Sequence, residues 1–145
     1  MEWIDLDRLQ RIARQESFEK QSYGRIADFL EHLKESNIVR NLLEIEHLFY
    51  PKYLWQEDKD LELYFFTNEE IVKCGIDTNE KFFITKRYTK NITKIEITNL
   101  DISNNDIQLN ITFSKDDELI FSSDNSNIHW KYKYFKKIIE LYDLL

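Results

Sequence analysis

The pattern of apolar and polar positions divides this chain into three parts. Up to about residue 36, apolar side chains recur every three or four positions, which is the period of an amphipathic helix. Across residues 61–124, short segments alternate apolar and polar side chains, which is the period of a half-buried strand. The helical period returns near the C-terminus. We therefore expect helices first, then strands, and then one closing helix.

The first part predicts two helices. Asp5 or Asp7 can cap a short first helix, because an aspartate side chain accepts hydrogen bonds from the free N–H groups of a first turn. Residues 17–20 are expected to open a longer second helix. Its buried face is marked by apolar positions at spacings of three and four: Tyr23, Ile26, Ala27, Phe29, Leu30 and Leu33.

Residues 38–50 fit either a helix or a strand. A helix capped by Asn37 would place Ile38, Leu42, Ile45 and Phe49 on one side. A strand is also consistent with the local alternation of apolar and acidic residues. We favour a helix up to residue 47, so that residues 1–50 would be mainly helical. Pro51 is expected to end either element, because the residue before a proline is pushed out of the helical region.

The third part reads as six strands of an antiparallel meander. The segments are rich in Ile, Phe, Tyr and Thr, the residues that favour strands. Polar turns separate them, at positions 68–69, 78–79, 90–91, 103–105 and 116–117, with too few residues for crossover helices. A parallel sheet is therefore excluded. The segments are LELYFFT, EEIVKCGID, KFFITKRYT, ITKIEITNLD, DIQLNITFS and ELIFSSD.

The last stretch, residues 127–145, predicts an amphipathic helix that closes the sheet. Its lysines lie on the opposite side from most of its rings, and only Tyr132 shares the lysine side. A groove that stacks single-stranded nucleic acid needs several exposed rings beside the charges, so we interpret this stretch as core. The positions expected to pack on the sheet are Trp130, Tyr134, Phe135, Ile138, Leu141, Tyr142 and Leu145.

The hairpin LYFFTNEEIVKCGID and the closing segment WKYKYFKKIIELYDLL carry a resemblance to a known family. Together with the meander, residues 61–145 resemble the pleckstrin-homology-like (PH-like) superfold. Such folds usually have seven strands, and the missing one would have to be residues 43–50, the ambiguous segment. The resemblance implies an adaptor that binds lipids, peptides or proteins. The acidic loop at residues 67–70 argues against phosphoinositides, which basic loops recognise.

Composition and charge then narrow the class of protein. The length fits one domain, residues 1–145, and the α+β class follows from the order of elements. Cys74 is the only cysteine, which excludes an internal disulfide and fits a reducing compartment, so we expect a cytoplasmic protein. A small, acidic chain of this build suits a bacterium or phage. No apolar run approaches the ~20 residues of a membrane span. The formal net charge of −7 makes nucleic acid an unfavourable partner.

The sequence gives little indication of a catalytic, metal-binding or cofactor-binding site. The three histidines are far apart, and none pairs with Cys74 at the spacing of metal ligands. Residues 101–106 carry oxygen ligands but lack the glycine and the final glutamate of a calcium loop, so a hairpin turn is expected. Cys74 alternates with Val72 and Ile76 in a strand and is expected to be buried and inert. We predict no catalytic, metal or cofactor-binding residue.

By elimination, we expect a small non-enzymatic module that binds another protein, as an inhibitor, immunity protein or adaptor. The segment TKRYTKNITK would place basic and aromatic side chains around one hairpin tip, facing an acidic patch on the partner. The alternatives are a polyanion binder that uses this hairpin and an enzyme with scattered catalytic residues. The sequence leaves homo-oligomerisation open. The predicted contact residues are Lys86, Arg87, Tyr88, Lys90 and Lys94.

Overall fold

The computed structural model describes residues 3–16, 21–35, 48–56 and 58–145. Its two N-terminal helices are α1 (Leu6–Glu16) and α2 (Gln21–Glu35). A four-stranded antiparallel sheet follows, in the order β1-β2-β3-β4, and then a three-stranded one, in the order β5-β6-β7. The strands are β1 (Leu48–Lys52), β2 (Glu62–Phe66), β3 (Glu70–Ile76), β4 (Phe82–Tyr88), β5 (Lys94–Asp101), β6 (Asp106–Ser114) and β7 (Asp117–Ser122), and α4 (Lys131–Leu144) closes the chain.

The predicted α+β class is confirmed, but the strands are arranged differently from the expected single meander. Each of the six predicted segments forms a strand, and β1 adds a seventh at the end of the ambiguous segment. The expectation that Pro51 ends an element is wrong, because Pro51 lies inside β1 and pairs in register with Leu63. Since β1 is an edge strand, the sheet tolerates a residue that has no N–H to donate. The predicted helix at residues 37–47 lies outside the described residues.

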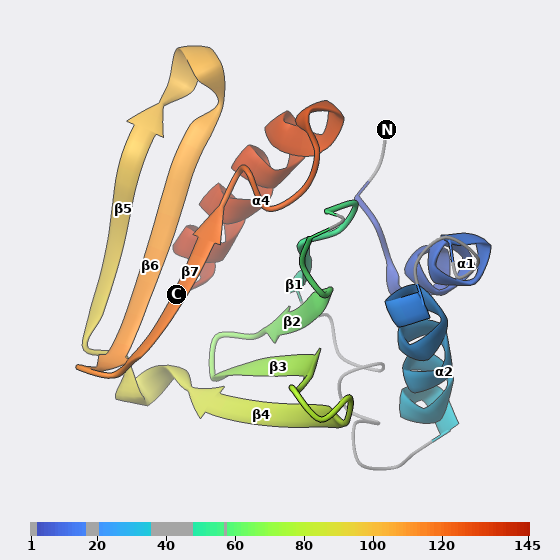
Figure 1. The fold of residues 1–145 in the computed structure, drawn as a ribbon. Helices are drawn as coiled ribbons and strands as arrows, with labels where there is room; N and C mark the ends of the chain where they lie inside the picture. The colour runs from blue at the N-terminus through green and yellow to red at the C-terminus, as the bar shows by residue number, and fades with distance from the viewer. Residues whose placement is uncertain (1–2, 17–20, 36–47, 57) are drawn as a thin grey trace.

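The prediction of a hairpin turn at residues 90–91 is also wrong, because the strands on either side of it do not pair with each other. Strand β4 pairs with β3, whereas β5 pairs with β6, so the connection between β4 and β5 passes from one sheet to the other (Figure 1). A short 3₁₀ helix, Thr89–Asn91, forms this crossover. Thr89 holds it against the β2–β3 turn, with its N–H donating to Glu69 O and its hydroxyl to Asn68 O. These two hydrogen bonds keep the crossover on the first sheet.

The core lies where the two sheets meet. Figure 1 shows the strands of the second sheet running across those of the first, with α4 beside β6 and β7. The ring of Tyr50 in β1 packs edge-on against Phe121 in β7, at 5.1 Å between centroids, and against Tyr134 in α4, also at 5.1 Å. Tyr64 in β2 reaches Phe121 at 4.8 Å. Edge-to-face aromatic contacts therefore join both sheets to the closing helix.

Helix α2 lies against the first sheet, and α1 packs on α2. Asp5 caps α1, because its Oδ1 accepts a hydrogen bond from Arg8 N at 2.7 Å, which confirms one of the two predicted caps. The predicted opening of α2 at residues 17–20 lies outside the described residues. Helix α2 stacks Phe29 on Phe82 of β4, with centroids 4.3 Å apart. No helix in the described ranges is long and apolar enough to cross a membrane.

Helix α4 confirms most of its predicted buried face. Four positions within it are buried, namely Tyr134, Phe135, Ile138 and Leu141, and Trp130 is buried in the preceding 3₁₀ turn. Tyr142 and Leu145 were wrongly predicted to be buried: Tyr142 is exposed and Leu145 only half-buried. Periodicity gives the direction in which a side chain points, but not whether another element lies beneath that turn.

We expect truncation before His129 to abolish cooperative unfolding. The second sheet would lose its cover, and the aromatic contact between Tyr50 and Tyr134 would disappear. Thermal unfolding followed by circular dichroism checks this prediction. A sharp transition near the melting temperature of the full chain would contradict it.

Two adjacent isoleucines offer a matched test of the packing of α4. Ile138 is 0% exposed and Ile139 is 40% exposed. We expect Ile138→Ala to lower the free energy of unfolding by about 2–5 kcal/mol, because it leaves a cavity in the core. The same change at Ile139 is expected to alter it by about 0.5 kcal/mol or less. Denaturant titration of both variants measures the difference, and equal losses would show that α4 packs differently.

Candidate functional site

A pocket of about 490 Å³ lies between the first sheet and β7. Its floor comes from β1, β2 and β3, and its far wall from β7 and the loop that follows it. Tyr53 and Tyr64 contribute aromatic surface. The charged side chains that line it are three lysines and three acids: Lys52, Lys59, Lys73, Glu62, Glu118 and Asp124.

Strand register brings the charged floor of this pocket together. Lys52 in β1 pairs with Glu62 in β2, and Tyr64 in β2 pairs with Lys73 in β3. Side chains of paired residues point to the same face of a sheet, as do those two positions apart along a strand. Lys52, Glu62, Tyr64 and Lys73 therefore share the face that Tyr50 buries against β7.

Lys52 is the unusual residue of the pocket. Lys52 is only 8% exposed, and its Nζ donates a hydrogen bond to the carbonyl oxygen of Ile120 at 2.6 Å. The same atom lies 4.9 Å from the ring centre of Tyr53. Within the described part of the chain, no carboxylate lies within ion-pair distance of this ammonium.

The surroundings of Lys52 disfavour its charged form. Burial lowers the pKa of Lys52 to about 8. The negative charge of Glu62 raises this pKa in part, and the smaller individual effects of the positive charges of Lys73 and Lys59 lower it further. A fraction of this amine is therefore neutral near neutral pH, unlike a surface lysine. Such a group can act as a proton acceptor or a nucleophile, or it can regain its charge when an anion binds.

Glu62 is held by two partners. Its Oε1 accepts a hydrogen bond from Tyr64 Oη at 2.7 Å and lies 3.8 Å from Lys73 Nζ. Burial raises the pKa of Tyr64 far above its usual range, and the negative charge of Glu62 raises it further, so the phenol stays protonated as a donor. The carboxylate of Glu62 is therefore committed to its own neighbours.

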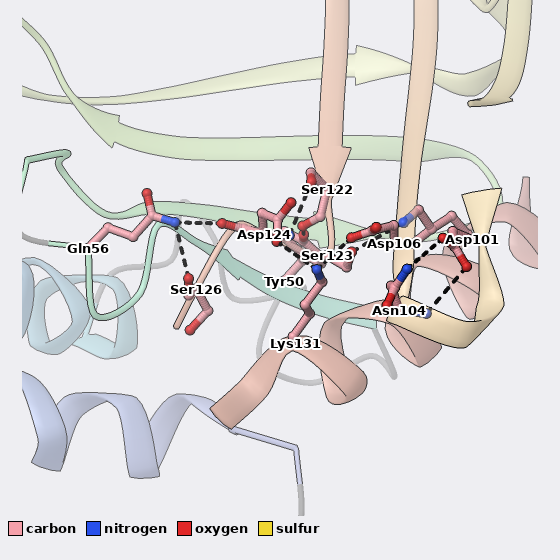
Figure 2. Close-up of polar contacts among 11 residues, drawn as sticks. Tyr50, Gln56, Asp101, Asn104, Asp106, Ser122, Ser123, Asp124, Ser126 and Lys131 are labelled. Carbon is pink, nitrogen blue, oxygen red and sulfur yellow. Dashed lines mark hydrogen bonds and ion pairs between the residues drawn. The ribbon is translucent and has the colours of Figure 1, made fainter. Parts of the chain in front are cut away.

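The far wall of the pocket is fixed by polar contacts around the start of α4 (Figure 2). Gln56 Nε2 donates to Asp124 O at 2.6 Å and lies 3.3 Å from Ser126 O. Lys131 Nζ lies 2.5 Å from Asp106 and 3.3 Å from Asp124. The charge of Asp124 is thus balanced from outside the pocket.

The predicted contact residue Arg87 forms an ion pair within the protein. Its guanidinium meets both carboxylate oxygens of Asp117 at 2.9–3.2 Å, linking β4 to β7. Hydrogen bonding from Arg87 lowers the pKa of Asp117. A bidentate pair of this kind joins the two sheets.

The other predicted contact residues lie along β4 and the crossover. Lys86 is half exposed and 3.4 Å from Glu70, and Tyr88 is 48% exposed. Lys90 Nζ lies 5.7 Å from the ring centre of Tyr88. Lys94 pairs with a glutamate on its own strand. The structure therefore brings Lys86, Tyr88 and Lys90 together on one exposed surface, with Arg87 turned away.

Sequence reasoning missed Lys52, and one signal could have found it. In LFYPK, the lysine stands two positions after Tyr50, so alternation places both on the same face of a strand. A lysine on the buried face of an apolar strand indicates a polar site inside the protein. The expectation that Pro51 ends the element separates Lys52 from this strand and hides the signal.

Two further candidates from the sequence, Cys74 and residues 101–106, lie in a strand and in a strand-to-strand turn. Cys74 is 1% exposed, and burial raises its pKa to about 12, which keeps it as a thiol. The calcium-like segment forms the predicted β5–β6 turn, with Asp101 accepting from Asn104 N and Asp106 facing Lys131. Across the described ranges, no cluster of three or more His, Cys, Asp or Glu side chains could hold a metal ion.

The chain belongs to the DUF3908 family, whose description is "protein of unknown function" and whose family model matches residues 10–136. No curated protein and no solved structure matched it. Membership of this family assigns no function to the chain, so the argument for a site rests on the geometry of its residues.

Replacing Lys52 by methionine is expected to stabilise the protein at pH 7. The change keeps most of the side-chain volume and removes a buried charge that lacks a carboxylate partner, so we expect a gain of roughly 1–3 kcal/mol. Because the folded state holds this proton less tightly than the unfolded state, the stability of the unmodified protein rises as pH increases from 8 toward 10.5. The advantage of Lys52→Met should therefore shrink over that window.

Urea unfolding of both proteins at pH 7 and pH 9.5 measures this difference. Comparing the two proteins at each pH cancels the titration of the buried tyrosines, which affects both equally. Lys115→Met, at an exposed position, is the control and should leave stability nearly unchanged at either pH. A large loss of stability in Lys52→Met at pH 7 would contradict the prediction.

Cys74 is expected to react slowly with a thiol reagent in the folded protein and quickly in denaturant. Burial and the raised pKa both keep the thiolate away from the reagent. The rate of labelling at pH 8, with and without guanidinium, checks this. Fast labelling of the native protein, combined with loss of function in Cys74→Val, would instead assign the thiol a catalytic role.

Proposed function

We propose that this protein is a small non-enzymatic binding module that docks an acidic, extended segment of another protein along β4. An inhibitor, immunity or adaptor role in the cytoplasm of a bacterium or phage-infected cell fits such a module. Two antiparallel sheets with a closing helix are compatible with a PH-like layout, whose members include peptide-binding adaptors. That analogy supports the proposal, while the argument for a site comes from β4 itself.

The edge position of β4 is the observation that carries this proposal. Strand β4 is last in the order of its sheet, and no strand among the described residues pairs with its outer side. A seven-residue edge strand presents free N–H and C=O groups that an extended segment can pair with. Ile84 and Tyr88 are exposed at 40% and 48%, and with Lys86 between them they form an apolar, basic and aromatic row.

Charge indicates the chemistry of the partner. The chain has a formal net charge of −7, yet this surface presents Lys86 and Lys90 beside the ring of Tyr88. Glu70 compensates only the first of them, at 3.4 Å. A local positive field on an acidic protein favours an acidic partner and speeds its association.

The geometry favours a protein over a single-stranded polyanion. Stacking sites present successive rings beside free cations. On β4 the exposed ring is that of Tyr88, and Arg87 is already paired with Asp117. Arg87 therefore acts as a link between the sheets, and Lys86 and Lys90 are the better positions for a test.

Changing Lys86 and Lys90 together to Glu is expected to weaken binding without unfolding the protein. The partner would be recovered with the tagged full chain from its native cell and then measured with both purified proteins. We expect association to slow roughly tenfold or more at low salt, and the difference to shrink as salt rises. The melting temperature should stay close to that of the unmodified protein, because both side chains are exposed.

The double change Lys115→Glu and Lys136→Glu is the matched control, since it reverses the same number of charges at exposed positions elsewhere. It should leave association nearly unchanged. Amide hydrogen exchange in the complex adds a second measurement, because a docked strand protects the outer N–H groups of β4. Equal effects of both double variants, or unprotected β4 amides, would exclude this docking mode.

A further inference from the structure

We propose that the pocket between the two sheets binds a small phosphorylated compound with an aromatic or apolar body, and that the ammonium of Lys52 is its central contact. This site is separate from the β4 edge, and the proposal holds or fails independently of partner docking. It assigns a ligand to Lys52, a buried cation of the pocket with no carboxylate within ion-pair distance in the described part of the chain.

The donor capacity of Lys52 is incompletely used. An ammonium has three N–H donors, and the structure gives one clear acceptor, the carbonyl of Ile120 at 2.6 Å. The nearby rings of Tyr53 and Phe121 stabilise the charge only by cation–π attraction. A buried charge without a paired opposite charge is costly, so an anion entering the pocket gains strongly from this group.

The other charges around the pocket favour an anion with more than one negative charge. Lys59 and Lys73 line the same space as Lys52, so three ammonium groups surround it, and the negative charge of Glu62 offsets part of their charge. Three acids also line it, but two are held by neighbours. Glu62 is bound by Tyr64 and Lys73, and Asp124 is paired with Lys131. The third, Glu118, is exposed on β7.

A phosphate monoester fits these groups better than a carboxylate. Its terminal oxygens can accept from several ammonium groups at once, and lysine is a point-charge donor that suits phosphate without a fixed angle. The rings of Tyr53 and Tyr64 and the side chain of Leu119 supply surface for the body of the ligand. A volume of about 490 Å³ lies within the usual range of small-molecule sites. No glycine-rich loop is needed, because side-chain ammonium groups replace backbone N–H donors.

Pyridoxal 5′-phosphate is a direct probe of both features, because it carries a phosphate and an aldehyde. The neutral amine of Lys52 attacks the aldehyde carbon, water leaves, and an imine forms. Added borohydride then transfers a hydride to the imine carbon and leaves a stable secondary amine on the lysine. Peptide mass spectrometry of the full chain measures the extent of labelling at each lysine.

We expect Lys52 to be labelled on the order of tenfold faster than Lys115 and Lys136 at pH 8, because more of it is neutral and the phosphate is held. Phenyl phosphate should slow the labelling of Lys52 and leave the two surface lysines unaffected. Pyridoxal, which has no phosphate, should label Lys52 more slowly. Equal labelling of all three lysines, or no protection by phenyl phosphate, would overturn the proposal.

Calorimetric titration of the unlabelled protein tests the choice of phosphate. We expect phenyl phosphate to bind at least several-fold more tightly than benzoate or inorganic phosphate, and Lys52→Met to abolish this binding. Lys73→Met provides a second variant on a different strand and should weaken it, whereas Lys115→Met should not. Benzoate binding as tightly as phenyl phosphate, or full binding by both pocket variants, would exclude a phosphate site. The variant Lys86→Glu with Lys90→Glu should bind phenyl phosphate normally, which separates this site from β4.

Discussion

The fold depends on how the hydroxyl of Tyr50 is satisfied where the two sheets meet. Tyr50 is completely buried in β1, and its Oη donates to Asn125 Oδ1 at 2.8 Å and lies 3.1 Å from Ser122 O. Asn125 Oδ1 also accepts from Ser122 N, so the same amide ends β7 and receives β1. A buried phenol without this partner would cost about 1–3 kcal/mol. In this arrangement the ring packs on Phe121 and Tyr134 while its hydroxyl keeps its hydrogen bonds.

The pocket is a consequence of that junction. Tyr53 N donates to Asn125 O at 2.8 Å, so the chain after β1 is tied to the same loop as Tyr50. Lys52 lies between these two attachments and shares the face of Tyr50, which forces its ammonium toward Ile120 on β7. Burial of this charge is thus imposed by the packing of the sheets. A position with such a cost is where we expect ligand chemistry, since structure alone would be served by an apolar side chain.

The sequence predicted most elements because their hydrophobic periods are strong. The strands from β2 to β7, the cap at Asp5 and the buried face of α4 all follow from local pattern. It failed where a distant partner decides the outcome. Pro51 lies within a strand because β1 is at the edge of a sheet, and the β4–β5 crossover is held by hydrogen bonds to the β2–β3 turn. Local sequence contains neither piece of information.

The cations of this acidic chain show why charge along the sequence does not identify which of them are paired within the protein. Arg87 was predicted to face a partner, but its bidentate pair with Asp117 makes it a link between the sheets. Lys131, at the start of α4, is paired with Asp106 and Asp124. Lys52 stands in an apolar segment, yet it has no carboxylate partner among the described residues. Whether a cation has an internal counter-charge depends on strand register and sheet packing, which the local sequence does not contain.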